Sequence, residues 1–169
     1  MSRLVCTRVA YLRIPWFQID VLRRAGHLAK GTPVALVQGQ GTRARVTLVD
    51  PAARAAGLIP GMRPTKARSL AATLQLRHWD ASAERAQEEA TEVLSTTLKT
   101  LSPRSTLIAP GQWWLEPASP NPHTEPSEVE MEMNFASRVI QAIRDLGFLG
   151  PRLAIADSPT CAAAATRDG

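Results

Sequence analysis

The sequence predicts an α+β fold of the ferredoxin-like type, β-α-β-β-α-β, with a small lobe inserted after the first strand. Short runs rich in Val, Leu, Ile and Thr are typical of strands, and two longer stretches carry apolar stripes at helical spacing. A separate group of short elements lies between the first strand and the first long helix, which indicates the insertion. We therefore expect one domain from residues 1–15 and 80–169, and an inserted lobe from residues 16–79.

The first half of the chain is predicted to consist of short elements. The β-branched run at residues 4–12 indicates a buried strand, and Pro15 suits the first turn of a helix that continues to Ala25. Asp50 is a good N-cap before Pro51, and Gly57 is suited to the position that follows the last residue of a short helix. The remaining predicted elements are a hairpin of strands at 33–37 and 44–49, a helix at about 65–72, and a strand at 74–76.

The second half carries the two long helices. The first is expected to begin at Asp80 or Ser82, and the second to end at Gly147. A strand pair at 105–109 and 112–116 turns at Pro110-Gly111, and a last strand at 152–156 precedes an alanine-rich helix start. Residues 117–134 contain four prolines, which favours a flexible surface loop. The helical stripes are Ala86, Ala90, Val93, Leu94, Leu98 and Leu101 in the first helix, and Phe135, Val139, Ile140, Ile143 and Leu146 in the second.

Composition excludes several classes of protein. The chain has 169 residues, 44% of them hydrophobic and 21% charged, which is typical of a globular domain. Its two cysteines, Cys6 and Cys161, do not make a disulfide scaffold, and its three scattered histidines lack zinc-ligand spacing. No apolar run approaches the length of a membrane span. We expect a cytoplasmic protein with no membrane partner, no metal and no cofactor.

Charge is distributed unevenly along the chain. Residues 1–79 hold 13 Lys and Arg against two acids, whereas residues 80–169 hold seven against 13. Such a division favours a polyanion as the partner of the first half. The alternative is that solvated arginines only keep the chain soluble, and charge alone does not separate the two interpretations.

Four segments in order resemble the Y-family (translesion) DNA polymerases. They are residues 9–17, 50–62, 107–116 and 153–160, where that family usually reads DMDAFFA, YEARKFGVRSGM, IDEAYLD and VGIAPNKL. The resemblance extends from Val9 to Gly169, except for the 117–134 loop, and implies a polymerase palm with an inserted fingers lobe. The family's thumb and C-terminal DNA-gripping domain would follow the last residue, so we expect this chain to lack them. Within the family, the chain is most similar to the ImuB-like subgroup, which keeps the polymerase shape without the metal-binding acids.

The metal-binding carboxylates of that family are missing at the matching positions. The resemblance puts its first two aspartates on Leu12 and Ile14, and its acidic pair on Gly111 and Gln112. Of the acids in the family's IDEAYLD segment, only the last has an acidic counterpart here, which is Glu116. Two-metal nucleotidyl transfer needs several oxygen ligands on neighbouring strands, so we expect no catalytic residues and no enzyme activity.

The rest of the implied nucleotide pocket is also changed. The arginine of the YEAR segment matches Arg54, but its tyrosine falls on Pro51, and a family lysine falls near Pro159. Arg54 is either a retained phosphate contact or a solvated helical arginine. Phe17 matches the bulky residue that senses the sugar in this family, or is simply part of the core.

The inserted lobe carries the candidate binding residues. Phosphate contacts by Lys and Arg would give weak, nonspecific DNA affinity with a steep salt dependence. The adjacent Trp113 and Trp114 could offer a stacking platform for bases, but neighbours on a strand face opposite sides, so we expect one of them in the core. The candidate set is Arg43, Arg45, Arg54, Arg63 and Lys66, together with Arg68.

Three functional interpretations follow. The favoured one is a non-catalytic scaffold in DNA repair and translesion synthesis, which binds DNA and brings a separate error-prone polymerase and other mutagenesis-complex proteins to damage. A second is a ferredoxin-like protein-interaction module, or a truncated gene fragment, without a nucleic-acid role. A third is a nucleotidyltransferase that uses relocated acids such as Glu116 and Asp157.

Overall fold

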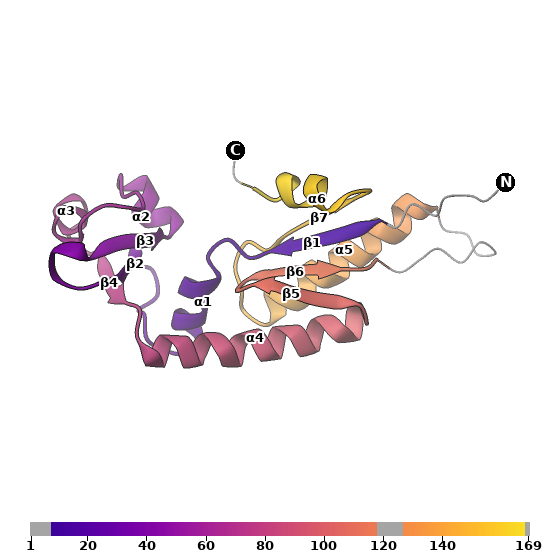
Figure 1. The fold of residues 1–169 in the computed structure, drawn as a ribbon, viewed down its shortest axis with the longest axis horizontal. Helices are drawn as coiled ribbons and strands as arrows, with labels where there is room; N and C mark the ends of the chain where they lie inside the picture. The colour runs from indigo at the N-terminus through magenta and orange to yellow at the C-terminus, as the bar shows by residue number, and fades with distance from the viewer. Residues whose placement is uncertain (1–7, 118–126, 168–169) are drawn as a thin grey trace. The chain divides into compact units, whose positions relative to one another are not determined.

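The computed structural model describes residues 8–117 and 127–167, which form two compact units (Figure 1). The larger unit comprises Met1–Pro15 and Thr91–Gly169, and the smaller unit comprises Trp16–Ala90. No helix among the described residues is both long enough and apolar enough to cross a membrane.

The larger unit is built on a four-stranded antiparallel sheet in the order β5-β6-β1-β7. The first strand of the chain is therefore central, with the hairpin on one side and the last strand on the other. This is the predicted ferredoxin-like arrangement of an α+β fold. The strands are β1 Val9–Arg13, β5 Ser105–Ala109, β6 Gln112–Leu115 and β7 Arg152–Ala156. Residues 4–7 of the strand predicted at 4–12 lie outside the described part of the chain.

Three helices accompany this sheet: α4 Ala81–Leu101, α5 Glu128–Asp145 and α6 Pro159–Ala165. The indole N–H of Trp113 donates to Ser95 Oγ of α4 at 3.1 Å, so α4 covers the face of β6 that carries this tryptophan. Leu94 and Leu98 of the predicted α4 stripe are fully buried. Val93 is 47% exposed, which corrects its assignment to the stripe, because it lies about 100° around the helix from Leu94.

The predicted loop at 117–134 is wrong for its last residues, since α5 already begins at Glu128. Ser127 accepts the Glu130 backbone N–H, and the Glu130 carboxylate accepts the Ser127 backbone N–H at 3.0 Å. This capping box fixes the helix start about two turns before the apolar stripe. Residues 118–126 of the expected loop lie outside the described residues.

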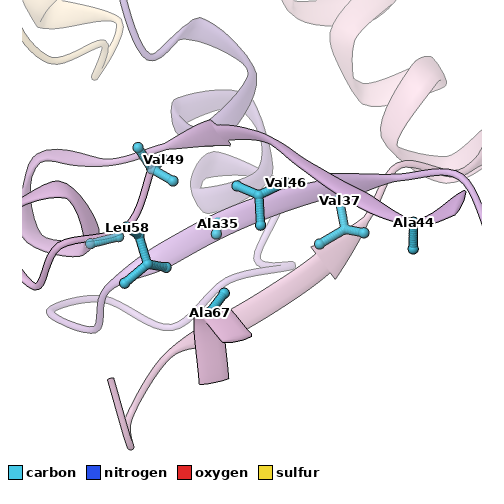
Figure 2. Packing of buried hydrophobic residues seen from close by; sticks show 8 residues of the cluster. Ala35, Val37, Ala44, Val46, Val49, Leu58 and Ala67 are labelled. Carbon is cyan, nitrogen blue, oxygen red and sulfur yellow. The ribbon is translucent and has the colours of Figure 1, made fainter. Parts of the chain in front are cut away.

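The smaller unit contains a three-stranded sheet in the order β3-β2-β4, in which β2 pairs antiparallel with β3 and parallel with β4. Along β2, Ala35 and Val37 face one apolar cluster, and Val34 and Leu36 face another, as the alternation of a strand requires. Figure 2 shows the first cluster around β2 and β3. The elements are α1 Phe17–Arg24, β2 Val34–Gln38, the 3₁₀ turn η1 Gly41–Arg43, β3 Arg45–Val49, α2 Pro51–Ala55, α3 Pro64–Leu70 and β4 Gln75–His78.

The smaller unit ends at Ala90, whereas we expected the inserted lobe to end at residue 79. The difference arises because the start of α4 packs with this unit. Ala83 is fully buried in a cluster with Ile19 and Leu22 of α1. The first turns of the long helix therefore belong to the hydrophobic core of the smaller unit.

Asp50 connects three elements of the smaller unit. Its carboxylate accepts the backbone N–H of Ala53 at 2.8 Å, which caps α2 as predicted, and the N–H of Val34 at 3.2 Å. The Arg23 guanidinium of α1 donates to the other oxygen at 2.6 Å. Because Asp50 is only 2% exposed, this buried charge depends on all three partners.

We expect Asp50→Ala to lower the free energy of unfolding by about 3 kcal/mol, because it removes a helix cap and leaves a partly buried guanidinium without its nearest carboxylate. Urea denaturation followed by tryptophan fluorescence measures the change. The matched control is Asp157→Ala, whose carboxylate is 66% exposed and 3.6 Å from Arg8; it should cost less than about 0.5 kcal/mol. Equal effects of the two substitutions would contradict this role of Asp50.

Candidate nucleic-acid interface and the sheet corner

The end of β1 and the start of β6 meet at one corner of the four-stranded sheet. The backbone N–H of Ile14 donates to the carbonyl oxygen of Gly111 at 2.8 Å, and Arg13 lies opposite Gln112. The structure therefore brings together the four positions that correspond to the family's carboxylates. We call the group of Leu12, Arg13, Ile14, Gly111 and Gln112 the sheet corner.

Leu12 faces the interior of the larger unit. It lies opposite Trp113 across β1 and β6, so both side chains are on the sheet face that α4 covers. Leu12 is 0% exposed and Ile14 is 3% exposed. Neither side chain offers an oxygen, and both contribute apolar packing where the resemblance implies metal ligands.

Gln112 is held by a neighbouring tyrosine. The Tyr11 hydroxyl donates to the Oε1 atom of Gln112, and the Tyr11 ring packs on Trp114 with 4.5 Å between ring centroids and 48° between ring planes. Tyr11 and Trp114 are cross-strand neighbours on the face opposite Leu12 and Trp113. The prediction that the two tryptophans face opposite sides, with one in the core, is confirmed, since Trp113 is 1% exposed.

Gly111 is required by the turn between β5 and β6. Its φ is 79°, a left-handed conformation that a residue with a Cβ rarely adopts. The position that matches a family carboxylate thus has no side chain, and its backbone conformation favours glycine.

The relocated acids do not gather at the sheet corner. Glu116 follows β6 and forms an ion pair with Arg104 at 3.3 Å, whereas Asp157 follows β7 and lies 3.6 Å from Arg8. Both acids lie at the other end of β1, just after the strands that flank it on opposite sides. Within residues 8–117 and 127–167, no group of three His, Cys, Asp or Glu side chains is placed to hold a metal ion.

The predicted basic residues lie in the smaller unit, and most of them gather near the start of β3. Arg43 ends the 3₁₀ turn that precedes Arg45, the first residue of β3. The backbone of Gly61 and Met62 runs along the free edge of β3, because each forms a hydrogen bond with Val46, at 2.7 and 2.9 Å. This pairing carries the chain to Arg63 and to the start of α3. We call Arg43, Arg45, Arg63, Lys66 and Arg68 the basic surface.

Arg54 is separate from the basic surface. It lies on α2, which follows the other end of β3. Arg45 is partly buried and donates through one nitrogen to the carbonyl oxygens of Thr42 and Ala44, both at 2.8 Å. The other basic side chains of the set are exposed, and in the described part of the chain no ion pair joins any of them to a carboxylate.

Phe17, the residue compared with the sugar-sensing position, is buried in the core.

The ferredoxin-like sheet with an inserted lobe is the architecture of the palm and fingers part of Y-family DNA polymerases. The chain belongs to the impB/mucB/samB family, whose model matches residues 14–167. No curated protein matches the sequence closely enough to add to this.

Solved structures agree with this assignment of the fold. DinB from Sulfolobus solfataricus matches with a TM-score of 0.70 and 16% identity over 92% of this chain and 44% of that chain. A post-insertion binary complex of Dbh DNA polymerase matches with a TM-score of 0.68 and 17% identity over 88% and 42%. A Y-family polymerase chimera of Dbh and Dpo4 gives 0.68 and 15% over the same shares. The chain therefore spans less than half the length of these structures.

We expect Leu12→Asp to lower the free energy of unfolding by about 3 kcal/mol or more, because an ionised carboxylate on the helix-covered face has no partner there. The conservative control Leu12→Met should cost less than about 1.5 kcal/mol, since it keeps the apolar volume. Thermal and urea denaturation of both variants measure the difference. If the aspartate variant were as stable as the methionine variant, Leu12 would not be the packing residue described here.

Proposed function

We propose that this chain is a non-catalytic Y-family polymerase-like protein, of the inactive ImuB-like kind, that binds DNA and recruits other proteins in translesion synthesis. The observation that carries the proposal is the residue content of the sheet corner. The four positions that correspond to metal-binding acids are Leu12, Ile14, Gly111 and Gln112.

The chemistry of metal-dependent nucleotidyl transfer explains why this content matters. Two divalent ions about 4 Å apart activate the 3′-hydroxyl and stabilise the leaving group, and they need several anionic oxygens to hold them. Leu12 and Ile14 supply none, Gly111 has no side chain, and Gln112 offers a neutral oxygen that already accepts the Tyr11 hydroxyl. The proposed protein therefore retains the polymerase fold without the means to gather the ions.

DNA binding is the activity that the remaining features support. The basic surface presents four exposed cations. Three of them, Arg63, Lys66 and Arg68, lie on α3 and its N-cap residue. Lys and Arg contacts to phosphate give affinity that does not depend on sequence and that is weak, about micromolar or poorer at physiological salt. The similar Dbh structure is described as a binary complex of a DNA polymerase, which agrees with a DNA ligand for this fold.

A protein that holds DNA and cannot extend it needs a partner that can. We infer that the partner is a separate error-prone polymerase, assembled with other proteins of a mutagenesis complex. In this arrangement, weak sequence-independent DNA binding is sufficient, because linked binding events raise the effective local concentration of the second partner.

Primer extension tests the absence of catalysis. With magnesium or manganese and all four deoxynucleotides, we expect no extension of a primed template above background, because the sheet corner lacks anionic ligands. A Y-family polymerase assayed in the same buffer is the positive control. Robust incorporation that persists after further purification would refute the non-catalytic proposal.

Charge removal tests DNA binding. Arg43, Arg45, Arg63 and Lys66, all replaced by Gln, should weaken DNA binding, and the slope of log K against log salt should decrease by about 3 to 4, because each phosphate contact contributes about 0.9. The control removes four exposed charges from α4 and α5, at Arg85, Lys99, Arg138 and Arg144. It should leave most of the slope unchanged.

The same pair of variants discriminates the second candidate function, a protein-interaction module without a nucleic-acid role. If neither the affinity nor the salt slope differs between the two quadruple variants, the basic surface is only a solvated face. Fluorescence anisotropy with a labelled oligonucleotide at several salt concentrations supplies both quantities.

A further inference from the structure

The two edges of the three-stranded sheet in the smaller unit have different neighbours. On the β3 side, the backbone of Gly61 and Met62 forms hydrogen bonds with Val46 and continues the pairing. On the other side, β4 pairs with β2 alone and is the last strand of the sheet. An uncovered edge strand presents N–H and C=O groups with which another extended chain can pair.

The pairing of β4 with β2 determines which backbone groups of β4 point outward. The N–H groups of Gln75 and Trp79 donate to carbonyl oxygens on the β2 side, at 2.9 and 3.0 Å. Because these groups alternate in direction along a strand, Leu76 and His78 direct theirs to the outer edge. In the described part of the chain, no backbone hydrogen bond joins Leu76 or His78 to a segment outside the sheet.

A pocket of about 430 Å³ adjoins β4. It is lined by residues 75–77 of the strand and by residues 26–29, the loop that follows α1. The loop contacts the strand through a side chain, because the Ala29 backbone N–H donates to the Oε1 atom of Gln75 at 3.1 Å. This contact leaves the outward backbone groups of β4 unused, and the pocket provides space for a side chain of an added strand.

The two faces of β4 differ in chemistry. Leu76 packs against the apolar cluster that Figure 2 shows. Gln75 and Arg77 lie on the opposite face, because side chains alternate along a strand. An added strand would alternate in the same way. It would place apolar side chains beside Leu76 and polar side chains beside Arg77.

Positive charge around the pocket selects acidic side chains for the polar face. Arg77 is already paired with Asp80 at 2.9 Å. Arg24 precedes the 26–29 loop and Lys30 follows it, and both are exposed. Among the described residues, no ion pair joins Lys30 to a carboxylate. The smaller unit as a whole holds 11 Lys and Arg against six acids, so two copies that met at this edge would bring like charges together.

The backbone groups of the edge favour a peptide over DNA. Leu76 and His78 offer both N–H donors and carbonyl acceptors, and a second peptide backbone can satisfy both kinds. The phosphate backbone of DNA has acceptor oxygens but no donor for the two carbonyl groups.

We propose that β4 is a docking edge for an extended acidic segment of another protein. The segment pairs with Leu76 and His78 as a further strand of the sheet, with apolar and acidic residues in alternation. This edge gives a location and a partner chemistry to the recruiting role proposed above, and it rests on that role. It does not depend on the basic surface or on DNA.

The test uses a fluorescein-labelled peptide of about eight residues, an ordinary strand length, in which Val and Glu alternate. With the whole chain, we expect saturable binding that weakens as salt is added. In the complex, the amide N–H groups of Leu76 and His78 should exchange with solvent more slowly. Those of Gln75 and Arg77, which already face β2, should change little. Anisotropy and amide hydrogen exchange followed by NMR measure the two effects.

His78→Pro removes an outward N–H and places a ring where the added strand would pair, so it should weaken peptide binding about tenfold. Proline is tolerated on an edge strand where its nitrogen faces solvent, and a melting curve checks that the variant folds. The matched control His78→Thr keeps both backbone groups and should bind as the unchanged protein does. A version of the peptide that is N-methylated at every backbone nitrogen cannot donate to the edge, so it should bind the unchanged protein about tenfold more weakly.

A second pair of variants tests the charge. Lys30→Gln should weaken peptide binding about threefold, as expected for the loss of an exposed ion pair. Lys66→Gln removes an exposed lysine from the basic surface of the same unit and should leave peptide binding unchanged.

Each other outcome would overturn the proposal. The alternating peptide might as a whole fail to bind, or it could bind without slower exchange at Leu76 and His78. Equal binding of the N-methylated peptide would show charge attraction alone. Slower exchange at the same two amides with an oligonucleotide would assign the edge to a nucleic acid, and slower exchange at higher protein concentration without peptide would assign it to a second copy. If the peptide does not bind while the unchanged chain still binds DNA with the expected salt slope, the docking edge is refuted and the proposed DNA binding stands.

Discussion

The antiparallel register between β1 and β6 determines what each side chain at the sheet corner can do. Because side chains alternate along a strand, pairing Leu12 with Trp113 directs both toward α4, and pairing Tyr11 with Trp114 directs those two to the other face. A slip of one residue would reverse both assignments and expose the core. The register thus makes Leu12 a packing residue and places Arg13 beside Gln112 on the other face of the sheet.

The smaller unit is organised by a different constraint, a buried carboxylate. Asp50 joins the end of β3 to α1 and to the first turn of α2, through hydrogen bonds that a buried charge requires. This matters for the basic residues because Arg45 is the first residue of β3 and Arg54 lies on α2. Cations carried by elements that are fixed in this way lose less conformational freedom on binding phosphate than cations on a loose tail would.

Sequence alone gave most of the elements because their signals are local. The Asp50-Pro51 cap, the turn at Gly111 and the alternating strands depend on neighbours in the chain. Two features depended on tertiary packing: the burial of Ala83 with α1, and the contact of Arg152 with the end of α6. The exposure of Val93 follows from its position about 100° around the helix from Leu94 and could have been predicted. The capping box at Ser127 was local and could have been found, since Ser-x-x-Glu precedes the helix. The placement of Arg13 opposite both Gln112 and Arg152 needed only the register of a ferredoxin-like sheet, once that fold was assigned.

The proposed loss of catalysis follows from a change of residue type at the sheet corner. A corner with carboxylates attracts divalent ions, and these ions in turn bind phosphate and activate a hydroxyl. In this chain Leu12 and Ile14 are instead buried in the core, and the Oε1 atom of Gln112 accepts the Tyr11 hydroxyl. A carboxylate at Leu12 would be a buried charge without a partner on the face that α4 covers. The packing that stabilises the sheet corner is therefore itself incompatible with the ligand set that metal-dependent transfer needs.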